Sequence, residues 1–201
     1  MRSSPERQTA IVRAACTLGA PVGAARAAVL GDRALRQIVE EVLKPTEIST
    51  DLPPSLEPAA LDLILMVDYA ETGRVADAVD RLRAAQLSLK PDGVLAIALS
   101  TLGAPMCAEG AGPYDGLLFP EAGAAGKLGA AAAHSTPLSM STWMLLAASL
   151  GFQIINSAGI GEHQAPAWLE RGHTARLSVF DAGELRTGQM VLLLKRRADS
   201  A

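Results

Sequence analysis

Residues 61–100 read LDLILMVDYAETGRVADAVDRLRAAQLSLKPDGVLAIALS, and this stretch decides the fold. The apolar run at residues 61–67 is too short for an independent helix and is typical of a strand buried on both faces of a parallel sheet. Residues 94–99, VLAIAL, predict a second buried strand. Between the two runs, apolar residues recur three and four apart, which predicts an amphipathic helix; they are Val75, Ala78, Val79, Leu82 and Ala85. Strand, helix and strand together predict one right-handed βαβ unit.

The limits of this helix can also be predicted. Thr72 is the expected N-cap, because a threonine hydroxyl accepts hydrogen bonds from the first free amides of a helix. Leu87 and Leu89 are expected to extend its buried side. Residues 90–93, KPDG, are expected to end it in a tight turn, since the residue before a proline leaves the helical region and Asp-Gly favours turns.

The chain before residue 61 shows the same alternation of strands and helices. Residues 1–9 are polar and expected to fray, and residues 11–18 fit a short helix or a strand. A buried strand ending in Asp32, a helix at residues 34–43 and a brief strand at residues 46–50 follow. Alternating strands and helices are typical of an open α/β sheet with helices on both faces.

The chain after residue 100 does not continue this alternation of strands and helices. Residues 101–135 hold seven glycines and three prolines, so we expect a mobile insertion with fast amide exchange. A helix at residues 139–150 follows, ended by Gly151 in the left-handed conformation. Strands are predicted at residues 153–156, 176–180 and 190–194, the last antiparallel to its neighbour at the sheet edge.

Composition limits the class of protein. The 201 residues are 49% hydrophobic and 19% charged, which predicts one globular α/β domain over residues 1–201. A net charge of −3 and 3% aromatic residues argue against a nucleic-acid partner or an acidic membrane surface. Two cysteines without a disulfide framework indicate a reducing compartment, and the longest apolar run is too short to span a bilayer. A cytoplasmic location is therefore expected.

No metal or catalytic site can be assigned from the sequence. The residues that could ligate a metal ion lack ligand spacing and are scattered: His134, His163, His173, Cys16 and Cys107. The motifs of a nucleophile elbow and of a phosphate-binding loop do not occur in the sequence. We therefore assign no catalytic residue, no cofactor-binding residue and no metal ligand.

A residual pocket remains an alternative. It would consist of Gly31, Asp32, Asp51 and Asp68, which follow predicted strands. Asp32 could hold a ribose hydroxyl or cap the next helix, and the sequence does not decide between these roles. Asp68 could face a ligand crevice or be a solvated loop residue. The glycine-rich turn that brings backbone donors close to a nucleotide is absent before Asp32.

Residues 26–195 resemble the class I S-adenosylmethionine methyltransferase fold. The segments DLIL, LKPDG and VLAIAL, then LGFQII and a closing apolar strand, occur in the order typical of that fold. The resemblance implies an open Rossmann-like, mostly parallel sheet with helices on both faces and an antiparallel edge strand. The chain differs from this fold in lacking its glycine-rich motif, so we expect the chain not to bind S-adenosylmethionine.

The anamorsin family also lacks the glycine-rich motif. Its N-terminal domain resembles a methyltransferase that starts late and lacks the cofactor loop, and the segments AAVLGD, LKPDGVLAIAL and MVLLLKRR follow its order. The resemblance implies a non-catalytic docking and stabilising module in cytosolic iron–sulfur assembly and electron transfer. It implies no cofactor in this chain, since the clusters of the family sit on a cysteine-rich C-terminal region outside these 201 residues.

The partners implied by the anamorsin resemblance are a diflavin reductase and the cysteine-rich C-terminal region of the same protein. Two alternatives remain open: an S-adenosylmethionine-dependent methyltransferase, and a degenerate partner subunit that activates one. The missing glycine-rich turn argues against the first alternative. A downstream cysteine-rich segment would argue against the second.

Overall fold

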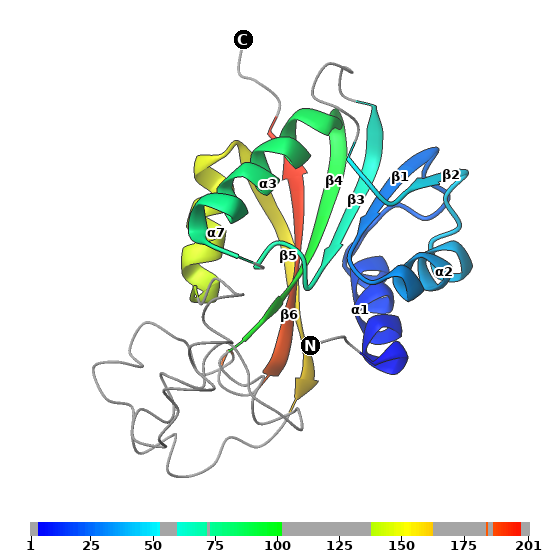
Figure 1. The fold of residues 1–201 in the computed structure, drawn as a ribbon, viewed down its shortest axis with the longest axis horizontal. Coiled ribbons are helices and arrows are strands. Elements are labelled where there is room, and N and C mark those ends of the chain that lie inside the picture. Colours follow the sequence, from blue (N-terminus) through cyan, green and yellow to red (C-terminus); the bar gives the residue numbers. More distant parts are fainter. Residues whose placement is uncertain are drawn as a thin grey trace.

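The computed structural model describes residues 4–52, 60–71, 73–101, 138–162, 184 and 187–197. These residues form a mixed sheet in the strand order β2-β1-β3-β4-β6-β5 (Figure 1). The strands are β1 (Arg26–Leu30), β2 (Glu47–Ser49), β3 (Leu61–Val67), β4 (Leu89–Ser100), β5 (Phe152–Glu162) and β6 (Thr187–Arg196). The helices are α1 (Pro5–Leu18), α2 (Arg33–Val42), α3 (Val75–Ser88) and α7 (Met140–Ser149).

The topology confirms the predicted fold class. Strands β2, β1, β3 and β4 are parallel, whereas β6 runs antiparallel to β4 and β5 antiparallel to β6. The chain moves outward in one direction from β1 to β2 and in the other from β3 to β4. The switch point therefore lies between the carboxyl ends of β1 and β3, where open α/β sheets bind ligands.

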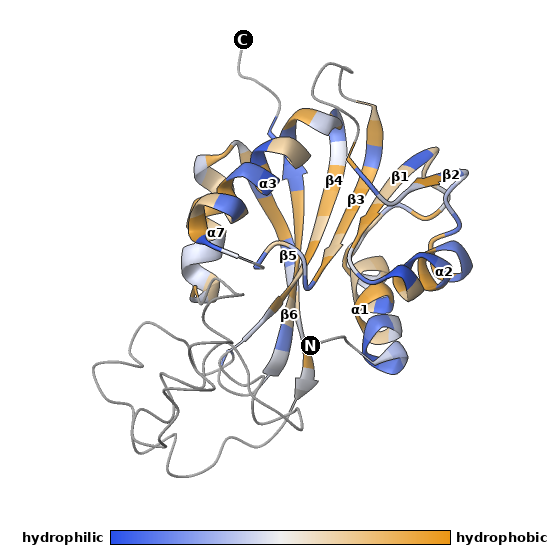
Figure 2. Ribbon diagram, viewed as in Figure 1, coloured by the Kyte–Doolittle hydropathy of each residue, from blue (hydrophilic) through white to orange (hydrophobic). Residues whose placement is uncertain are grey.

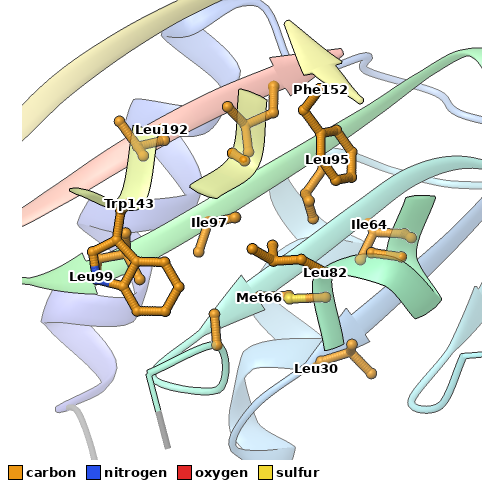
Figure 3. Packing of buried hydrophobic residues seen from close by; sticks show 14 of the residues in the cluster. Leu30, Ile64, Met66, Leu82, Leu95, Ile97, Leu99, Trp143, Phe152 and Leu192 are labelled. Atoms are coloured by element: carbon orange, nitrogen blue, oxygen red, sulfur yellow. The ribbon is translucent and has the colours of Figure 1, made fainter. Parts of the chain in front are cut away.

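The helices cover both faces of the sheet. On one face, Leu95, Ile97 and Leu99 of β4 pack into a core with side chains from α3 and α7, including Trp143 (Figure 3). On the other face, Ala96 and Ala98 pack into a core with α1 and α2. Hydrophobic residues accordingly dominate β1, β3 and β4 (Figure 2). In β3, every residue except Asp62 is buried, as the sequence predicts.

The N-terminal segment differs from the prediction. Residues 5–18 form one helix rather than a frayed end followed by a short helix or strand. Ser4 begins it by accepting a hydrogen bond from the Arg7 N–H at 3.3 Å, and Pro5 suits the first helical turn. The helix is stable because its inner stripe packs against the sheet; this stripe comprises Gln8, Ile11, Val12 and Ala15.

The predicted limits of α3 were also wrong. The N-cap position is occupied by Arg74, not Thr72, which lies outside the described residues. The Arg74 N–H donates to Asp77 Oδ2 at 2.7 Å, so an acidic side chain one turn inside the helix replaces the expected hydroxyl cap. Leu87 is 56% exposed, and Leu89 already belongs to β4.

Residues 90–93 do not form the predicted turn but lie within β4. Leu61 pairs with Leu89 and Leu63 with Val94, so β4 has a bulge here. Lys90 Nζ donates to Asp62 Oδ1 at 2.7 Å, and this bond lowers the pKa of Asp62. Pro91 is tolerated because a bulge frees its position from donating to the ladder.

The C-terminal half agrees with the prediction where it is described. Ser139 caps α7 by accepting from the Thr142 N–H at 3.2 Å, and Gly151 has a φ of 84°. The predicted strand at residues 153–156 extends through Phe152–Glu162, and the final strand through Thr187–Arg196. The predicted strand at residues 176–180 and the insertion at residues 101–135, except Thr101, lie outside the described residues.

Gly31→Ala is expected to destabilise the domain by more than about 2 kcal/mol. Gly31 has a φ of 154°, and an added Cβ would lie 2.8 Å from the Val67 carbonyl oxygen. Gly23→Ala is the matched control, because Gly23 also has a positive φ but its Cβ would meet nothing within 4 Å. The control should cost only about 1 kcal/mol. Urea unfolding measures both values; equal losses would contradict the role of the contact with Val67.

Candidate functional site

The four residues of the predicted pocket all follow carboxyl ends of parallel strands. Gly31 follows β1, and its closeness to the Val67 carbonyl brings the ends of β1 and β3 into contact. Asp68 follows β3, while Asp51 follows β2 and is exposed. The structure therefore places these residues at one edge of the sheet.

Asp32 is the N-cap of α2. Its Oδ1 accepts from the Ala34 N–H at 3.1 Å, and its carbonyl accepts from the Leu35 N–H at 3.0 Å. Of the two roles that the sequence left open, the helix cap is the one present. The connection from β1 to α2 consists of Gly31 and Asp32 alone.

Asp51 takes part in a local turn. Its N–H donates to Ser49 Oγ at 3.1 Å, and the Ser49 hydroxyl donates to the Asp51 carbonyl at 2.8 Å. Asp68 is different, because its side chain reaches across the sheet and accepts from Gln189 Nε2 at 2.9 Å. Asp68 also has a φ of 52°, a conformation that a non-glycine residue keeps only when its surroundings hold it.

A second acidic residue, Glu71, completes a polar cluster that consists of the half-buried Asp68 and the buried Glu71, Ser100 and Gln189. Glu71 is 7% exposed. Its carboxylate accepts from the Ser100 N–H at 2.8 Å and from Ser100 Oγ at 2.7 Å. Ser100 pairs with Gln189 between β4 and β6, which links both acids to the same strand pair. The loop after β3 is thereby fastened to the ends of β4 and β6.

Burial raises the pKa of Glu71 from its ordinary value of 4.5 to about 7. The two hydrogen bonds from Ser100 oppose this increase because they stabilise the carboxylate. Asp68 raises the Glu71 pKa further by charge repulsion, and Arg7 of α1 lowers it by attraction. Glu71 can therefore hold or release a proton near neutral pH, a property found at many functional sites.

Two amide oxygens are buried without a hydrogen bond from the described residues, and one of them belongs to Gln189 of the cluster. They are Gln189 Oε1 and Gln8 Oε1, and both residues are at most 2% exposed. Gln8 lies on the inner stripe of α1, next to Arg7. Since unpaired buried oxygens are costly, these two favour a donor group from water or a ligand.

Sequence reasoning missed Glu71, Ser100 and Gln189. Gln189 could have been found, because it shares the period-two face of Val191 and Leu193 in β6. Glu71 has no such signal: its burial follows from a loop that folds back onto β4. Within the described part of the chain, no group of three or more His, Cys, Asp or Glu side chains is placed to hold a metal ion. No helix in that part is long and apolar enough to cross a membrane.

Comparisons with known proteins agree on the fold. A SAM-dependent methyltransferase from Archaeoglobus fulgidus matches with a TM-score of 0.61 and 12% identity, over 96% of this chain and 95% of its own. The 1,6-didemethyltoxoflavin-N1-methyltransferase of Burkholderia thailandensis matches with a TM-score of 0.53 and 13% identity, over 96% and 80%. The chain has the class I methyltransferase fold.

The reaction does not follow from this likeness. The [4+2]-cyclase SpnF is also similar to the chain, with a TM-score of 0.50 and 14% identity over 96% of this chain and 81% of its own. Methyltransferases and a cyclase thus share the fold, and function must be argued from the site. No family model and no curated protein matches the sequence.

The stability of the domain is expected to fall as pH rises from about 4.5 to about 7. The folded state holds the Glu71 proton more tightly than the unfolded state does. The protonated Glu71 therefore contributes its full stabilisation below the pKa of the unfolded state, and this contribution is lost as pH rises through the pKa of the folded state. The change attributable to this group is on the order of 3 kcal/mol. Urea unfolding as a function of pH measures it. Glu71→Gln should remove this component, and a Gln variant with the same slope as the parent would refute the assignment.

Proposed function

We propose that this chain is a non-catalytic, methyltransferase-like domain of the anamorsin type. It serves as a docking and stabilising module in cytosolic iron–sulfur assembly, within electron transfer to the assembly machinery. The observation that carries its non-catalytic character is the connection from β1 to α2 through Gly31 and Asp32 alone. The role in iron–sulfur assembly rests on the sequence resemblance.

The residues at this connection do not fit S-adenosylmethionine. In open α/β sheets, a small-residue turn presents free backbone N–H groups at the start of a helix to a ligand. Here the Ala34 and Leu35 N–H groups are bonded to Asp32. Gly31 occupies the space beside the Val67 carbonyl. A ligand would have to displace the cap of α2 to reach these donors, so we derive no methyl transfer at this site.

A second candidate, an S-adenosylmethionine-dependent methyltransferase, is favoured by one observation. The polar cluster of Asp68, Glu71, Ser100 and Gln189 lies at the carboxyl edge of the sheet, and Glu71 has a pKa near neutrality. Such a group suits proton transfer. The cluster supplies an acid or base but does not replace the missing cofactor turn.

Calorimetric titration of the chain with S-adenosylmethionine is expected to give no saturable heat at sub-millimolar concentration. A charge-assisted hydrogen bond from Asp32 would contribute about 1–2 kcal/mol, whereas micromolar affinity requires about 8 kcal/mol. Glu47→Ala is a control that removes an acidic side chain at the start of β2, away from the connection. Binding with a low-micromolar dissociation constant, lost in Asp32→Ala and kept in Glu47→Ala, would favour the methyltransferase function over the docking role.

A diflavin reductase is the partner that the proposal implies, and binding between the purified proteins tests it. We expect saturable binding of the reductase to the chain, without added S-adenosylmethionine. A reductase with a single flavin domain serves as the control for nonspecific flavoprotein binding. Equal binding of both reductases, or of neither, would contradict the docking role.

A further inference from the structure

The loop after β3, residues 68–71, is attached to the sheet at both of its ends. At its first residue, Asp68 Oδ1 accepts from Gln189 Nε2 of β6 at 2.9 Å. At its last residue, the Glu71 carboxylate accepts from the Ser100 N–H of β4 at 2.8 Å and from the Ser100 hydroxyl at 2.7 Å. These bonds join the loop to the carboxyl end of β4 and to the amino end of β6, which pair with each other at the carboxyl edge of the sheet.

The middle of this loop buries little apolar surface. Tyr69 is 36% exposed, and its ring lies 5.0 Å from the Arg81 guanidinium of α3. Arg81 also donates to the Ala70 carbonyl at 3.4 Å. The Ala70 methyl group is buried in the core that includes α3, but one methyl group stabilises far less than a large apolar side chain does. Because segments held by few apolar contacts open at a lower free energy than a core does, the loop can open while the sheet stays folded.

The backbone of this segment also favours opening. Asp68 has a φ of 52°, which is costly for a residue other than glycine, so opening the loop relieves local strain. Gly73 follows shortly after the loop with a φ of 87°, and glycine changes its conformation with little steric hindrance. The loop therefore has a strained residue at its start and a conformationally permissive residue beyond its end.

The closed loop holds the Glu71 proton more tightly than an open loop would. Burial raises the pKa of Glu71 to about 7, and repulsion by Asp68 adds to this increase, whereas the bonds from Ser100 and attraction by Arg7 of α1 oppose it. In the cluster, β4 and β6 contribute only uncharged side chains, and the charged residue of α3 that contacts the loop is Arg81. In an open loop, solvent would return the Glu71 pKa to its ordinary value of 4.5. Closing of the loop and binding of the proton are therefore linked.

We propose that the loop after β3 is a proton-dependent switch, which is closed on β4 and β6 while Glu71 is protonated and opens when Glu71 loses its proton. Opening exposes the polar ends of β4 and β6 at the carboxyl edge, where open α/β sheets bind ligands. The proton concentration thereby controls access to this edge. The switch is a local motion of residues 68–71 and is distinct from unfolding of the domain. It does not rest on the proposed function.

Amide hydrogen exchange of the full 201-residue chain, followed by NMR between pH 4 and pH 8, tests the switch. The Ser100 N–H reports on the loop directly, because its acceptor is Glu71. After correction for the intrinsic exchange rate, its protection is expected to fall about 200-fold as pH rises over this range. The Ile97 N–H is the internal control, since Ile97 lies in the middle of β4 between β3 and β6. It should remain better protected than the Ser100 N–H at every pH.

Variants of the neighbouring charges should change this loss of protection in opposite directions. Asp68→Asn keeps an acceptor for Gln189 and tolerates the left-handed backbone, but it removes the repulsion, so the loss should become smaller. Arg7→Gln removes the attraction, so the loss should become larger. Glu71→Gln should abolish the dependence on pH. Glu47→Gln is the matched control, because it removes an acidic group at the start of β2 and should behave as the parent chain does.

Several outcomes would overturn the switch. Equal protection of the Ser100 and Ile97 amides at every pH would show that Glu71 acts only on unfolding of the whole domain. A Ser100 amide whose protection does not change with pH would show that the loop stays closed. Asp68→Asn and Arg7→Gln variants that shift the loss in the same direction, or not at all, would also contradict it. These two variants decide the matter even if Glu71→Gln does not fold.

Discussion

The structure depends on the burial of β3 on both faces. Six of the seven residues of Leu61–Val67 are buried, so neither face of the sheet can be left to solvent. Each face therefore requires its own helices, and α1 with α2 on one side and α3 with α7 on the other meet this requirement. Asp62 is the exception, and its bond with Lys90 satisfies its charge at the amino end of the strand.

The same constraint shapes the carboxyl edge. Because β1 and β3 are neighbours, their outgoing connections must diverge at the point where Gly31 meets the Val67 carbonyl. In a nucleotide-binding sheet this divergence leaves a crevice. Here the connection from β1 to α2 has only two residues, while the loop after β3 buries Glu71 against Ser100 of β4. The polar residues of the site therefore belong mainly to the loop after β3, where Asp68 and Glu71 lie, and not to the connection after β1.

Much of this architecture could be predicted from the sequence, because buried parallel strands are continuous apolar runs and helices show a distinct period. The strands at residues 61–67 and 94–99 follow from such runs. The failures occurred where tertiary contacts override local signals. A proline and an Asp-Gly pair predicted a turn, but β4 pairs with β3 on either side of residues 90–93, at Leu89 and at Val94, so these residues form a bulge within the strand. Glu71 could not be predicted, since its burial depends on contact with Ser100, far away in the chain.

The bulge in β4 has a consequence for how the chain can change in length. From Leu89 to Val94 the strand advances five residues, while β3 advances two from Leu61 to Leu63. The surplus is looped out at Pro91 and Asp92, which are exposed, whereas the added Cβ of any residue at Gly93 would meet the Leu61 carbonyl at 2.9 Å. Residues inserted between Pro91 and Asp92 would therefore leave the alignment of the central strands intact. The bulge near the amino end of β4 is therefore a position where a peptide could be inserted, away from the carboxyl edge of the sheet.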